Sequence, residues 1–465
     1  MTNLERVFYM IPGCNVVISA RIAGNISEPE LCRSIEEVRR MHPLIGAKIV
    51  FDERHDAWFS HDNVPPLPLR IVKRKSDTQW FSEVQDEQRA GFLLEQGPLI
   101  RFVLVYSPEV SDLVIICNHG ICDGMALANL VRDILERYSH PEKAITAIPA
   151  PDIMDILPCR KGFSIKRLIS GFFTVYGNSR WRKSPHCFSD EDYVAITKAY
   201  WDKREYRAAL FELGPEETTE LTVRCRKEGI TIGSAVTTAF IAAHENCAGA
   251  FSGHYKTLSI PFDLRRHATH PVGDVFCLCV GGAQFPFTYN GKRSFWENAA
   301  VLHKEIHKRV KNLDSAGLEI PGFYPPFIDA FASYASLYAV IPEAFARTSA
   351  LSRFAGDSKN IAFSFANNFA KMSPGIIPSN LGKLSIPDTY GDLRLDRMVF
   401  LPAVSETVPL ITGGISIGER TVFSLMYPEP IGPASASRTG EIIRIRNRAL
   451  ELLGFSEKMS SAELI

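Results

Sequence analysis

One apolar run limits the architecture of this chain more than any other segment. Residues 113–117 contain no polar side chain, and a run without alternation is typical of a strand buried on both faces of a sheet. Residues 99–105 form a second apolar run, and Ser107-Pro108-Glu109 lies between the two, which predicts an antiparallel pair. After Gly124 apolar residues recur at helical spacing. The segment therefore predicts an α/β (α+β) fold in which a buried strand leads directly into an amphipathic helix.

Strand-like and helix-like patterns continue along the rest of the chain. Ser27 is a suitable N-cap for a helix whose apolar residues recur every three to four positions. The second half begins much as the first does, with a strand followed by helices, one of them capped near Thr231. Further strands are expected at residues 16–22, 44–51, 205–211, 257–261, 276–285, 394–401, 408–413 and 422–427, and further helices at 77–89, 294–310 and 441–453.

The chain has 465 residues, which is too long for one ordinary domain. The proline-rich stretch 140–192 interrupts the regular patterns. We therefore place the lobe boundary within this linker and expect an N-terminal lobe at residues 1–185, which includes most of the linker, and a C-terminal lobe at residues 186–465. Within the linker, residues 161–183 mix basic and aromatic side chains. This pattern fits either a solvated connector helix or a segment in peripheral contact with a membrane.

Composition excludes several classes of function. Lys plus Arg equals Asp plus Glu, 52 against 52, so no overall field attracts nucleic acid. The ten cysteines are scattered, and only Cys277 and Cys279 are close in sequence, which matches neither a disulfide framework nor a zinc site. No stretch reaches the roughly 20 apolar residues of a membrane span, and the N-terminus lacks the features of a signal peptide. The expectation is a cytoplasmic protein without a metal.

The connection between the buried strand and the following helix carries the candidate chemistry. His119 and Asp123 lie on this connection, and functional side chains are often placed on such loops at a sheet edge. Histidine is suited to proton transfer near neutral pH. Gly120 and Gly124 are expected to leave room for a substrate, and Asp123 to pair with a cation or cap the helix. On spacing alone, a loop histidine beside an N-cap aspartate explains the same residues.

The segment Asn118-His119-Gly120-Ile121-Cys122-Asp123-Gly124 resembles the HxxxDG signature of the chloramphenicol acetyltransferase-like superfamily. This superfamily includes condensation domains of peptide synthetases, polyketide-associated acyltransferases and alcohol acetyltransferases. Four further segments resemble landmarks of the superfamily and occur in its order: His42-Pro43-Leu44, Gly97-Pro98-Leu99-Ile100-Arg101, Phe262-Asp263-Leu264-Arg265 and Ser379-Asn380-Leu381-Gly382.

The resemblance implies two similar lobes in a V-shaped pseudo-dimer with a tunnel between them. It implies that His119 is the general base and that Asp123 fixes the loop through a salt bridge, for which Arg265 is the candidate partner. Ser379 and Asn380 would line the tunnel and help polarise the thioester oxygen. No cofactor is implied as a permanent ligand. A coenzyme A thioester, or a phosphopantetheinyl group on an acyl carrier protein, would be the co-substrate.

Two departures narrow this resemblance. Condensation domains and several relatives carry a second histidine immediately before the catalytic one, whereas this chain has Asn118. A D-F-G-W-G motif, typical of the plant relatives, is absent from the sequence. The first difference favours a stand-alone acyltransferase that acts on an alcohol or amine, either a small molecule or a lipid. The second argues against the plant branch of the superfamily. The alternatives are a carrier-dependent, amide-forming condensation enzyme and a non-catalytic relative that binds a carrier protein or an acyl chain.

Two other patterns are less informative. Residues 414–418 match the G-x-S-x-G nucleophile elbow, but the residues that follow read as a strand instead of the required helix. A β-hairpin turn is therefore expected there. His303 and His307 are four residues apart, but the intervening order is not that of a metal-binding helix, so a solvated helical face is expected.

Overall fold

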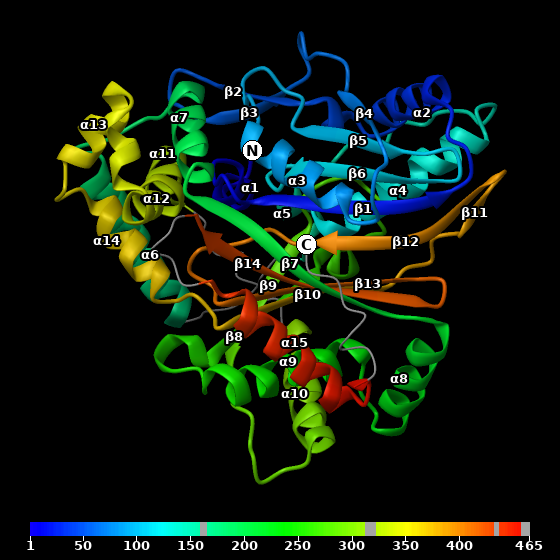
Figure 1. Ribbon diagram of the computed structural model, residues 1–465. Helices are drawn as coiled ribbons and strands as arrows, with labels where there is room; N and C mark the ends of the chain where they lie inside the picture. The colour runs from blue at the N-terminus through cyan, green and yellow to red at the C-terminus, as the bar shows by residue number, and fades with distance from the viewer. Residues whose placement is uncertain (159–164, 312–321, 432–436, 457–465) are drawn as a thin grey trace.

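Two six-stranded sheets form the framework of the protein (Figure 1). The computed structural model describes residues 1–158, 165–311, 322–431 and 437–456. The order of the first sheet is β11-β12-β1-β6-β5-β4, and that of the second is β7-β14-β13-β10-β8-β9. The strands of the first sheet are β1 (Asn15–Ala23), β4 (Leu69–Lys73), β5 (Ile100–Tyr106), β6 (Val110–Asn118), β11 (Thr389–Tyr390) and β12 (Leu393–Leu401).

The second sheet combines parallel and antiparallel pairs. β10 is parallel to β13 and to β8, whereas β14 is antiparallel to both of its neighbours. The strands of the second sheet are β7 (Arg204–Leu213), β8 (Thr257–Asp263), β9 (Val280–Pro286), β10 (Ile376–Lys383), β13 (Leu410–Ile417) and β14 (Arg420–Pro430). A separate antiparallel pair consists of β2 (Lys48–Phe51) and β3 (Ala57–Ser60).

The predicted central strand is present. β6 lies between β1 and β5 and pairs antiparallel with each, and every residue from 111 to 118 is buried. This confirms the expected antiparallel pair and the burial of the apolar run on both faces. The helix predicted after Gly124 is α4 (Gly124–Ser139), so the strand, the loop and the helix follow one another as expected.

The first sheet is completed by a segment from the far end of the sequence. β12 pairs antiparallel with β1, although the two strands are separated by more than 300 residues of chain. The sequence predicts β12 as a strand of the C-terminal half but gives no indication of this pairing. A division of the chain near residue 185 stays a prediction, and any such division must allow residues 389–401 to contribute to the sheet built by the N-terminal half.

Both faces of the second sheet are covered. Along β7, Ala208 and Leu210 belong to the hydrophobic core shared with the first sheet, whereas Ala209 and Phe211 belong to a second core. Because successive side chains of a strand point to opposite faces, the sheet separates these two cores. Figure 1 shows the helices of the second core on the outer side of this sheet; they are α8 (Pro215–Lys227), α9 (Ile232–Ala248), α10 (Phe295–Val310) and α15 (Thr439–Leu453).

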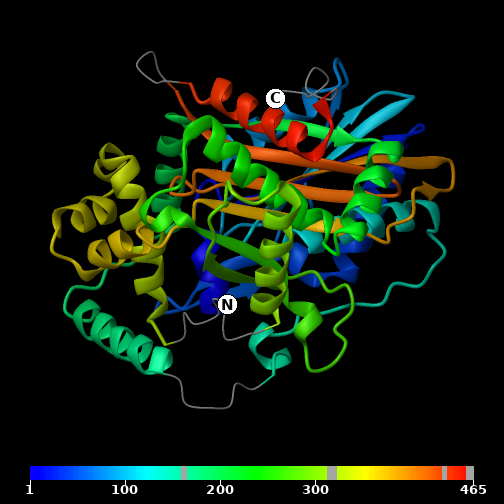
Figure 2. The same ribbon diagram turned by 90° about the horizontal axis from the view of Figure 1, so that it is seen from below.

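The other helices lie around the first sheet and along one side of the molecule (Figure 2). α1 (Asn3–Tyr9), α2 (Glu28–Met41) and α3 (Gln79–Ala90) belong to the N-terminal part. α5 (Ile153–Ile156) and α6 (Ile165–Trp181) lie in the described part of the proline-rich linker, and α7 (Asp190–Trp201) begins at its end. A further group, absent from the sequence-based expectations, comprises α11 (Pro325–Ile328), a π-helical segment (Asp329–Tyr334), α12 (Ala335–Val340), α13 (Ser349–Gly356) and α14 (Ile361–Ala370).

Two predicted strands are shorter than expected. The strand predicted at residues 44–51 begins only at Lys48, because Pro43 initiates a 3-10 turn, Pro43–Gly46. The strand predicted at 276–285 begins at Val280. The main-chain groups just before Val280 bind two side chains of the candidate active site instead, as described below.

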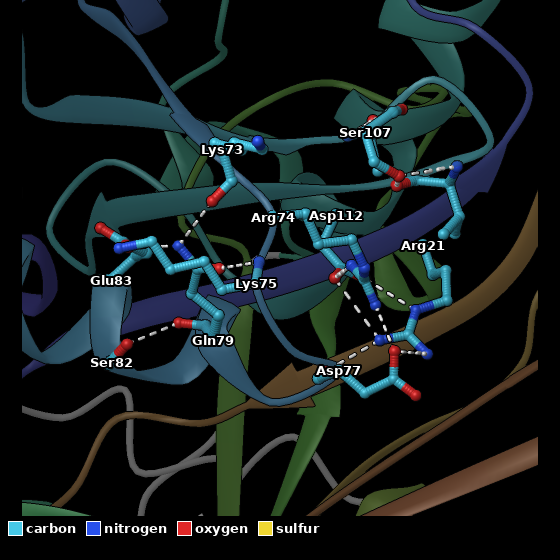
Figure 3. A network of polar contacts seen from close by, with 12 residues as sticks. Arg21, Lys73, Arg74, Lys75, Asp77, Gln79, Ser82, Glu83, Ser107 and Asp112 are labelled. Atoms are coloured by element: carbon cyan, nitrogen blue, oxygen red, sulfur yellow. Dashed lines mark hydrogen bonds and ion pairs between the residues drawn. The ribbon is translucent and has the colours of Figure 1, made fainter.

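Figure 3 shows a cluster of charged side chains that includes Arg21 and Asp112. By the register of β1 and β6, these two residues lie at the opposite end of the strand pair from Asn118 and His119. In the register of these strands, Arg21 faces Asp112. The Arg21 Nε atom donates to the buried Asp112 carboxylate at 2.9 Å, which also accepts a hydrogen bond from Arg74. Arg74 in turn donates to Asp77 at 2.7 Å. These opposite charges form ion pairs with one another, so the cluster connects the segment after β4 to the centre of the first sheet.

Candidate active site

His119 is held by its main chain at the end of β6. Its N–H donates to the carbonyl oxygen of Cys14 at 3.2 Å, and Cys14 immediately precedes β1. The next turn is closed by a hydrogen bond from the Ile121 N–H to the Asn118 carbonyl oxygen at 3.2 Å. The loop between β6 and α4 is therefore bonded both to itself and to the residue that precedes β1, which fixes the main chain of His119.

The tautomer of His119 follows from its hydrogen bond. The Nδ1 atom lies 2.7 Å from the carbonyl oxygen of Cys122, and a carbonyl oxygen can only accept. Nδ1 therefore carries the proton and Nε2 is left with a free lone pair. Burial lowers the pKa of His119 below its usual value of 6.5, although the Cys122 carbonyl and the charge of Asp123 oppose this shift. A neutral imidazole with an unprotonated Nε2 is the form that a general base requires.

An aromatic ring supports the same imidazole. Phe8, in α1, stacks on His119 with 4.5 Å between the ring centroids and an angle of 30° between the planes. The stacked ring and the Cys122 carbonyl together restrict the rotation of the imidazole. Sequence reasoning missed Phe8, because nothing in the pattern of residues 3–9 indicates that this short helix packs against a loop more than 100 residues further along the chain.

Asp123 does not contact the imidazole but organises the loop. One carboxylate oxygen accepts a hydrogen bond from the Ala126 N–H at 2.8 Å, which makes Asp123 the N-cap of α4. The other oxygen accepts from the Arg265 Nη1 atom and from the Cys279 N–H, both at 2.8 Å. The predicted pairing of Asp123 with Arg265 is thus present. The same carboxylate serves as the helix cap and as the partner of the cation, which the sequence treats as alternatives.

Arg265 joins the start of α4 to the second sheet. It lies in a 3-10 turn, Leu264–His267, directly after β8. Its Nη2 atom donates to the carbonyl oxygens of Val275 at 3.1 Å and Cys277 at 3.0 Å, and Nη1 also donates to Asp263. Burial lowers the pKa of Arg265, but the charge of Asp123, its hydrogen bond to Arg265 and the side chains of Cys277 and Cys279 together raise the pKa overall. Arg265 therefore stays charged. The segment 275–279 supplies partners to both members of the pair, which explains why β9 begins only at Val280.

Asn118 and Gly120 connect the loop to α1. The Asn118 amide nitrogen donates to the Tyr9 carbonyl oxygen at 3.0 Å, and its amide oxygen accepts from the Gly120 N–H at 2.9 Å. The side chain that precedes His119 is thus engaged with α1 and with its own loop. A Cβ atom at Gly120 would lie 2.9 Å from the Tyr9 Cβ atom. These contacts agree with a supporting role for both residues.

Gly124 permits close packing of neighbouring segments, so the expectation that it leaves room for a substrate is wrong. A Cβ atom at this position would lie 2.8 Å from two atoms of the Phe400 ring and 2.9 Å from a methyl group of Leu381. The space that the missing side chain leaves is therefore occupied by β12 and β10 and does not admit a substrate. Similarly, Gly120 faces α1. The two glycines allow the loop to fit between neighbouring segments of the protein.

Ser379 and Asn380 lie on β10, the strand whose Leu381 reaches the start of α4. Ser379 is paired with Gly413 and Asn380 with Gly414 on β13. The Asn380 side chain is exposed, and its Oδ1 atom accepts a hydrogen bond from the Gly382 N–H at 2.8 Å. β10 is thus close to the β6–α4 loop. The predicted contribution of these two residues to a tunnel and to thioester binding stays a prediction.

A buried ion pair anchors α1 to the π-helical segment. Arg6 donates to both carboxylate oxygens of Asp329, at 3.2 and 2.5 Å, and the Tyr9 hydroxyl donates to the same carboxylate at 3.0 Å. Burial raises the pKa of Asp329, and the charge of Arg6 opposes this. Sequence reasoning missed this group, because 323 residues separate its two charges. The pair fixes the helix that carries Phe8 and the Tyr9 carbonyl.

The two alternative patterns of the sequence can now be located in the structure. The G-x-S-x-G match lies on β13 and leads through Gly418 into the antiparallel strand β14. It is therefore the predicted hairpin, and Ser416 shares a hydrogen bond with Thr421 across it. On α10, the His303 Nδ1 atom lies 2.9 Å from the Ser234 hydroxyl. Within the described residues, no group of three His, Cys, Asp or Glu side chains is arranged to hold a metal ion.

All nine cysteines in the part of the chain that the structure describes are free. Among the helices described, none is long and apolar enough to cross a membrane. A cavity of 320 Å³ lies between α3 and α7 and is lined by residues that include Phe92, Tyr193 and Trp201 but not His119.

No family model matches the chain, but two curated proteins do. A hybrid PKS-NRPS synthetase of Trichoderma harzianum is 26% identical over 140 residues, which are 30% of this chain and 3% of the synthetase. The chondramide synthase of Chondromyces crocatus is 24% identical over 151 residues, which are 28% of this chain and 4% of the synthase. The matched regions are therefore small parts of much longer proteins.

Solved structures match over nearly the whole chain. Trichothecene 15-O-acetyltransferase from Fusarium sporotrichioides has a TM-score of 0.63 at 12% identity, covering 97% of this chain and 94% of that one. Polyketide synthase associated protein 5 from Mycobacterium tuberculosis has a TM-score of 0.58 at 12% identity, covering 97% of both chains. The condensation domain of the monacolin K polyketide synthase has a TM-score of 0.60 at 8% identity, covering 98% and 95%.

This chain has the chloramphenicol acetyltransferase-like fold. The expected fold class is confirmed, and the resemblance to the superfamily is confirmed at the level of the fold. Within this fold the HxxxDG segment forms the connection between β6 and α4, and Arg265 forms a salt bridge with the aspartate of this segment, Asp123. The V-shaped arrangement of lobes and the tunnel between them stay predictions.

Proposed function

We propose that this protein is an acyltransferase in which His119 is the general base. The observation that carries the proposal is the hydrogen bond from Nδ1–H to the Cys122 carbonyl oxygen, which leaves Nε2 as a proton acceptor on a firmly held ring. The donor would be a thioester of coenzyme A or of a phosphopantetheinyl carrier protein. The acceptor would be an alcohol or an amine. The fold shared with a trichothecene 15-O-acetyltransferase supports the ester-forming version of this reaction.

The proposed reaction proceeds without an acyl-enzyme. Nε2 of His119 takes the proton of the acceptor hydroxyl while the acceptor oxygen attacks the thioester carbonyl carbon. The tetrahedral intermediate then collapses, the carbon–sulfur bond breaks, and the departing sulfur takes the proton from Nε2. The products are the ester and the free thiol. Ser379 and Asn380 are the proposed donors toward the carbonyl oxygen, and Asp123 and Arg265 hold the loop without touching the reacting atoms.

The test is acyl transfer by the purified protein. The wild type is incubated with a panel of acyl-coenzyme A thioesters and small-molecule and lipid acceptors, and the products are identified by mass spectrometry. We expect His119→Ala to lower turnover by about 10²–10⁴-fold, the usual contribution of a positioned general base. His140→Ala is the matched control, because His140 is an exposed histidine at the other end of α4. Turnover of His119→Ala close to that of the wild type would exclude His119 as the base.

A second candidate is amide formation between carrier-bound partners. The observation in its favour is that one curated relative is a hybrid PKS-NRPS synthetase and the other a chondramide synthase. Carrier proteins loaded with an acyl group are therefore included in the panel. Products formed only from carrier-bound donors and amines would favour condensation. Binding of the carrier without transfer to any acceptor in the panel would instead favour a non-catalytic relative.

A further inference from the structure

Helix α6 is attached to the protein by one face. On that face, the Trp181 ring stacks on Phe327 with 5.1 Å between centroids. A Cβ atom at Gly177 would lie 2.8 Å from Phe327 and 2.9 Å from Phe365. The Asn178 side chain donates to the Gly322 carbonyl oxygen at 2.6 Å and accepts from the Tyr324 N–H at 3.0 Å. The orientation of the helix is therefore fixed, and its opposite face points outward.

The outward face of α6 is apolar. Six large hydrophobic side chains are exposed on it, with exposed fractions of 64% for Leu168, 52% for Ile169, 70% for Phe172, 53% for Phe173, 69% for Val175 and 47% for Tyr176. Scattered single hydrophobic residues are normal on a protein surface, whereas a contiguous group marks a contact surface. Figure 2 shows the helix at the margin of the molecule, where a flat surface can approach it.

The apolar face is accompanied by positive charge. Residues 165–183 include five basic and no acidic residues, although the whole chain has equal numbers of each. Arg180 is exposed and follows Tyr176 by one helical turn on the same side, and Lys183 is exposed just after the helix ends. Residues 159–164, which precede the helix, lie outside the described residues. The local charge therefore complements an anionic surface.

We propose that the exposed face of α6 binds the surface of a membrane that contains anionic lipids. An amphipathic helix with aromatic side chains on one side and Lys or Arg beside them lies in the plane of the interface. The phenylalanines reach the boundary of the acyl chains, while Arg180 and Lys183 reach the phosphate groups. The positive charge at the edge of the face favours this occupant over a second copy of the chain, which would bring the same positive charges together. The proposal does not depend on acyl transfer.

The experiment measures binding of the full-length protein to vesicles by co-sedimentation. Vesicles of phosphatidylcholine with phosphatidylglycerol are compared with vesicles of phosphatidylcholine alone. We expect binding to the anionic vesicles that weakens with salt. Phe172→Ser with Phe173→Ser should lower the partition coefficient roughly tenfold for each phenylalanine. Arg180→Gln with Lys183→Gln should lower it roughly fivefold for each charge.

The matched control is Val223→Ser with Val301→Ser, which removes two apolar side chains exposed on α8 and α10 and should leave binding unchanged. Circular dichroism of each variant verifies that the fold is retained, which is expected because all the substituted side chains are exposed. Absence of binding to anionic vesicles, or equal loss in the control, would overturn the proposal. So would concentration-dependent dimerisation of the wild type without lipid that Phe172→Ser abolishes, because α6 would then contact a second copy.

Discussion

The carboxylate of Asp123 accepts three hydrogen bonds inside the protein, and Asp123→Ala leaves all three donors without this partner. Loss of the N-cap of α4 costs about 1 kcal/mol. Breaking a buried ion pair costs about 3–5 kcal/mol, and the lower value applies because Arg265 keeps the Asp263 carboxylate and two carbonyl oxygens as partners. We therefore expect the free energy of unfolding to fall by about 4 kcal/mol.

The assay is urea denaturation, followed in parallel by circular dichroism and tryptophan fluorescence. Asp123→Asn separates the two contributions, because asparagine is as good an N-cap as aspartate but carries no charge. The free energy of unfolding of this variant should fall by about 3 kcal/mol, through loss of the ion pair alone. Asp263→Asn is the matched control. Asp263 contacts the same guanidinium at the longer distance of 3.2 Å and is more exposed, so its loss should stay below about 1 kcal/mol.

A double-mutant cycle tests the coupling of Asp123 and Arg265. The variant Asp123→Asn with Arg265→Met removes both charges, so its loss of stability should be smaller than the sum of the two single losses by at least about 1 kcal/mol. Strictly additive losses would show that Asp123 and Arg265 do not stabilise each other. Equal destabilisation by Asp123→Asn and Asp263→Asn would show that burial and geometry do not distinguish the two carboxylates.

Two further predictions concern His119 and Gly124. Because burial lowers the pKa of His119, kcat/KM of the proposed transfer should fall only as the pH drops through a pKa below 6.5, measured as a pH–rate profile. The unfolded chain binds this proton more readily than the folded protein, so the stability that His119 contributes is lost as the pH falls below about 6.5, and His119→Gln should flatten that part of a stability–pH curve. Gly124→Ala places a methyl group against Phe400 and should lower stability by about 1–3 kcal/mol in thermal unfolding, whereas Gly171→Ala in α6, with no atom within 4 Å of the added carbon, should not lower it.

The sequence predicts those parts of the fold that depend on residues close to one another in the chain. The unbroken apolar run marks β6, and the cap residue Thr231 marks the start of α9, because its side chain accepts a hydrogen bond from the main chain three residues later. Pro43 shows the limit of such reasoning. The residues after it are apolar enough for a strand, but proline at the first position favours a helical turn, and Pro43–Gly46 adopts one.

Pairings between distant segments could not be predicted from periodicity. Nothing in residues 393–401 distinguishes a strand that joins β1 from one that joins the second sheet, because both environments bury apolar side chains. The pairing of Asp123 with Arg265 was expected only through the resemblance to a superfamily. The shortened β9 has a similar cause, since the main chain of residues 275–279 binds Arg265 and Asp123 instead of a neighbouring strand.

The position of the imidazole depends on segments outside the HxxxDG motif. The loop donates hydrogen bonds to α1 and to Cys14, its His119 ring stacks on α1, and through Asp123 it accepts hydrogen bonds from residues 265–279. α1 is itself fixed by the buried pair of Arg6 and Asp329, and Asp329 begins a π-helical segment, a distortion that often occurs at functional sites. The motif alone therefore does not determine the geometry of His119. A chain with the same motif but without an equivalent of this support would retain the histidine and lose its fixed orientation.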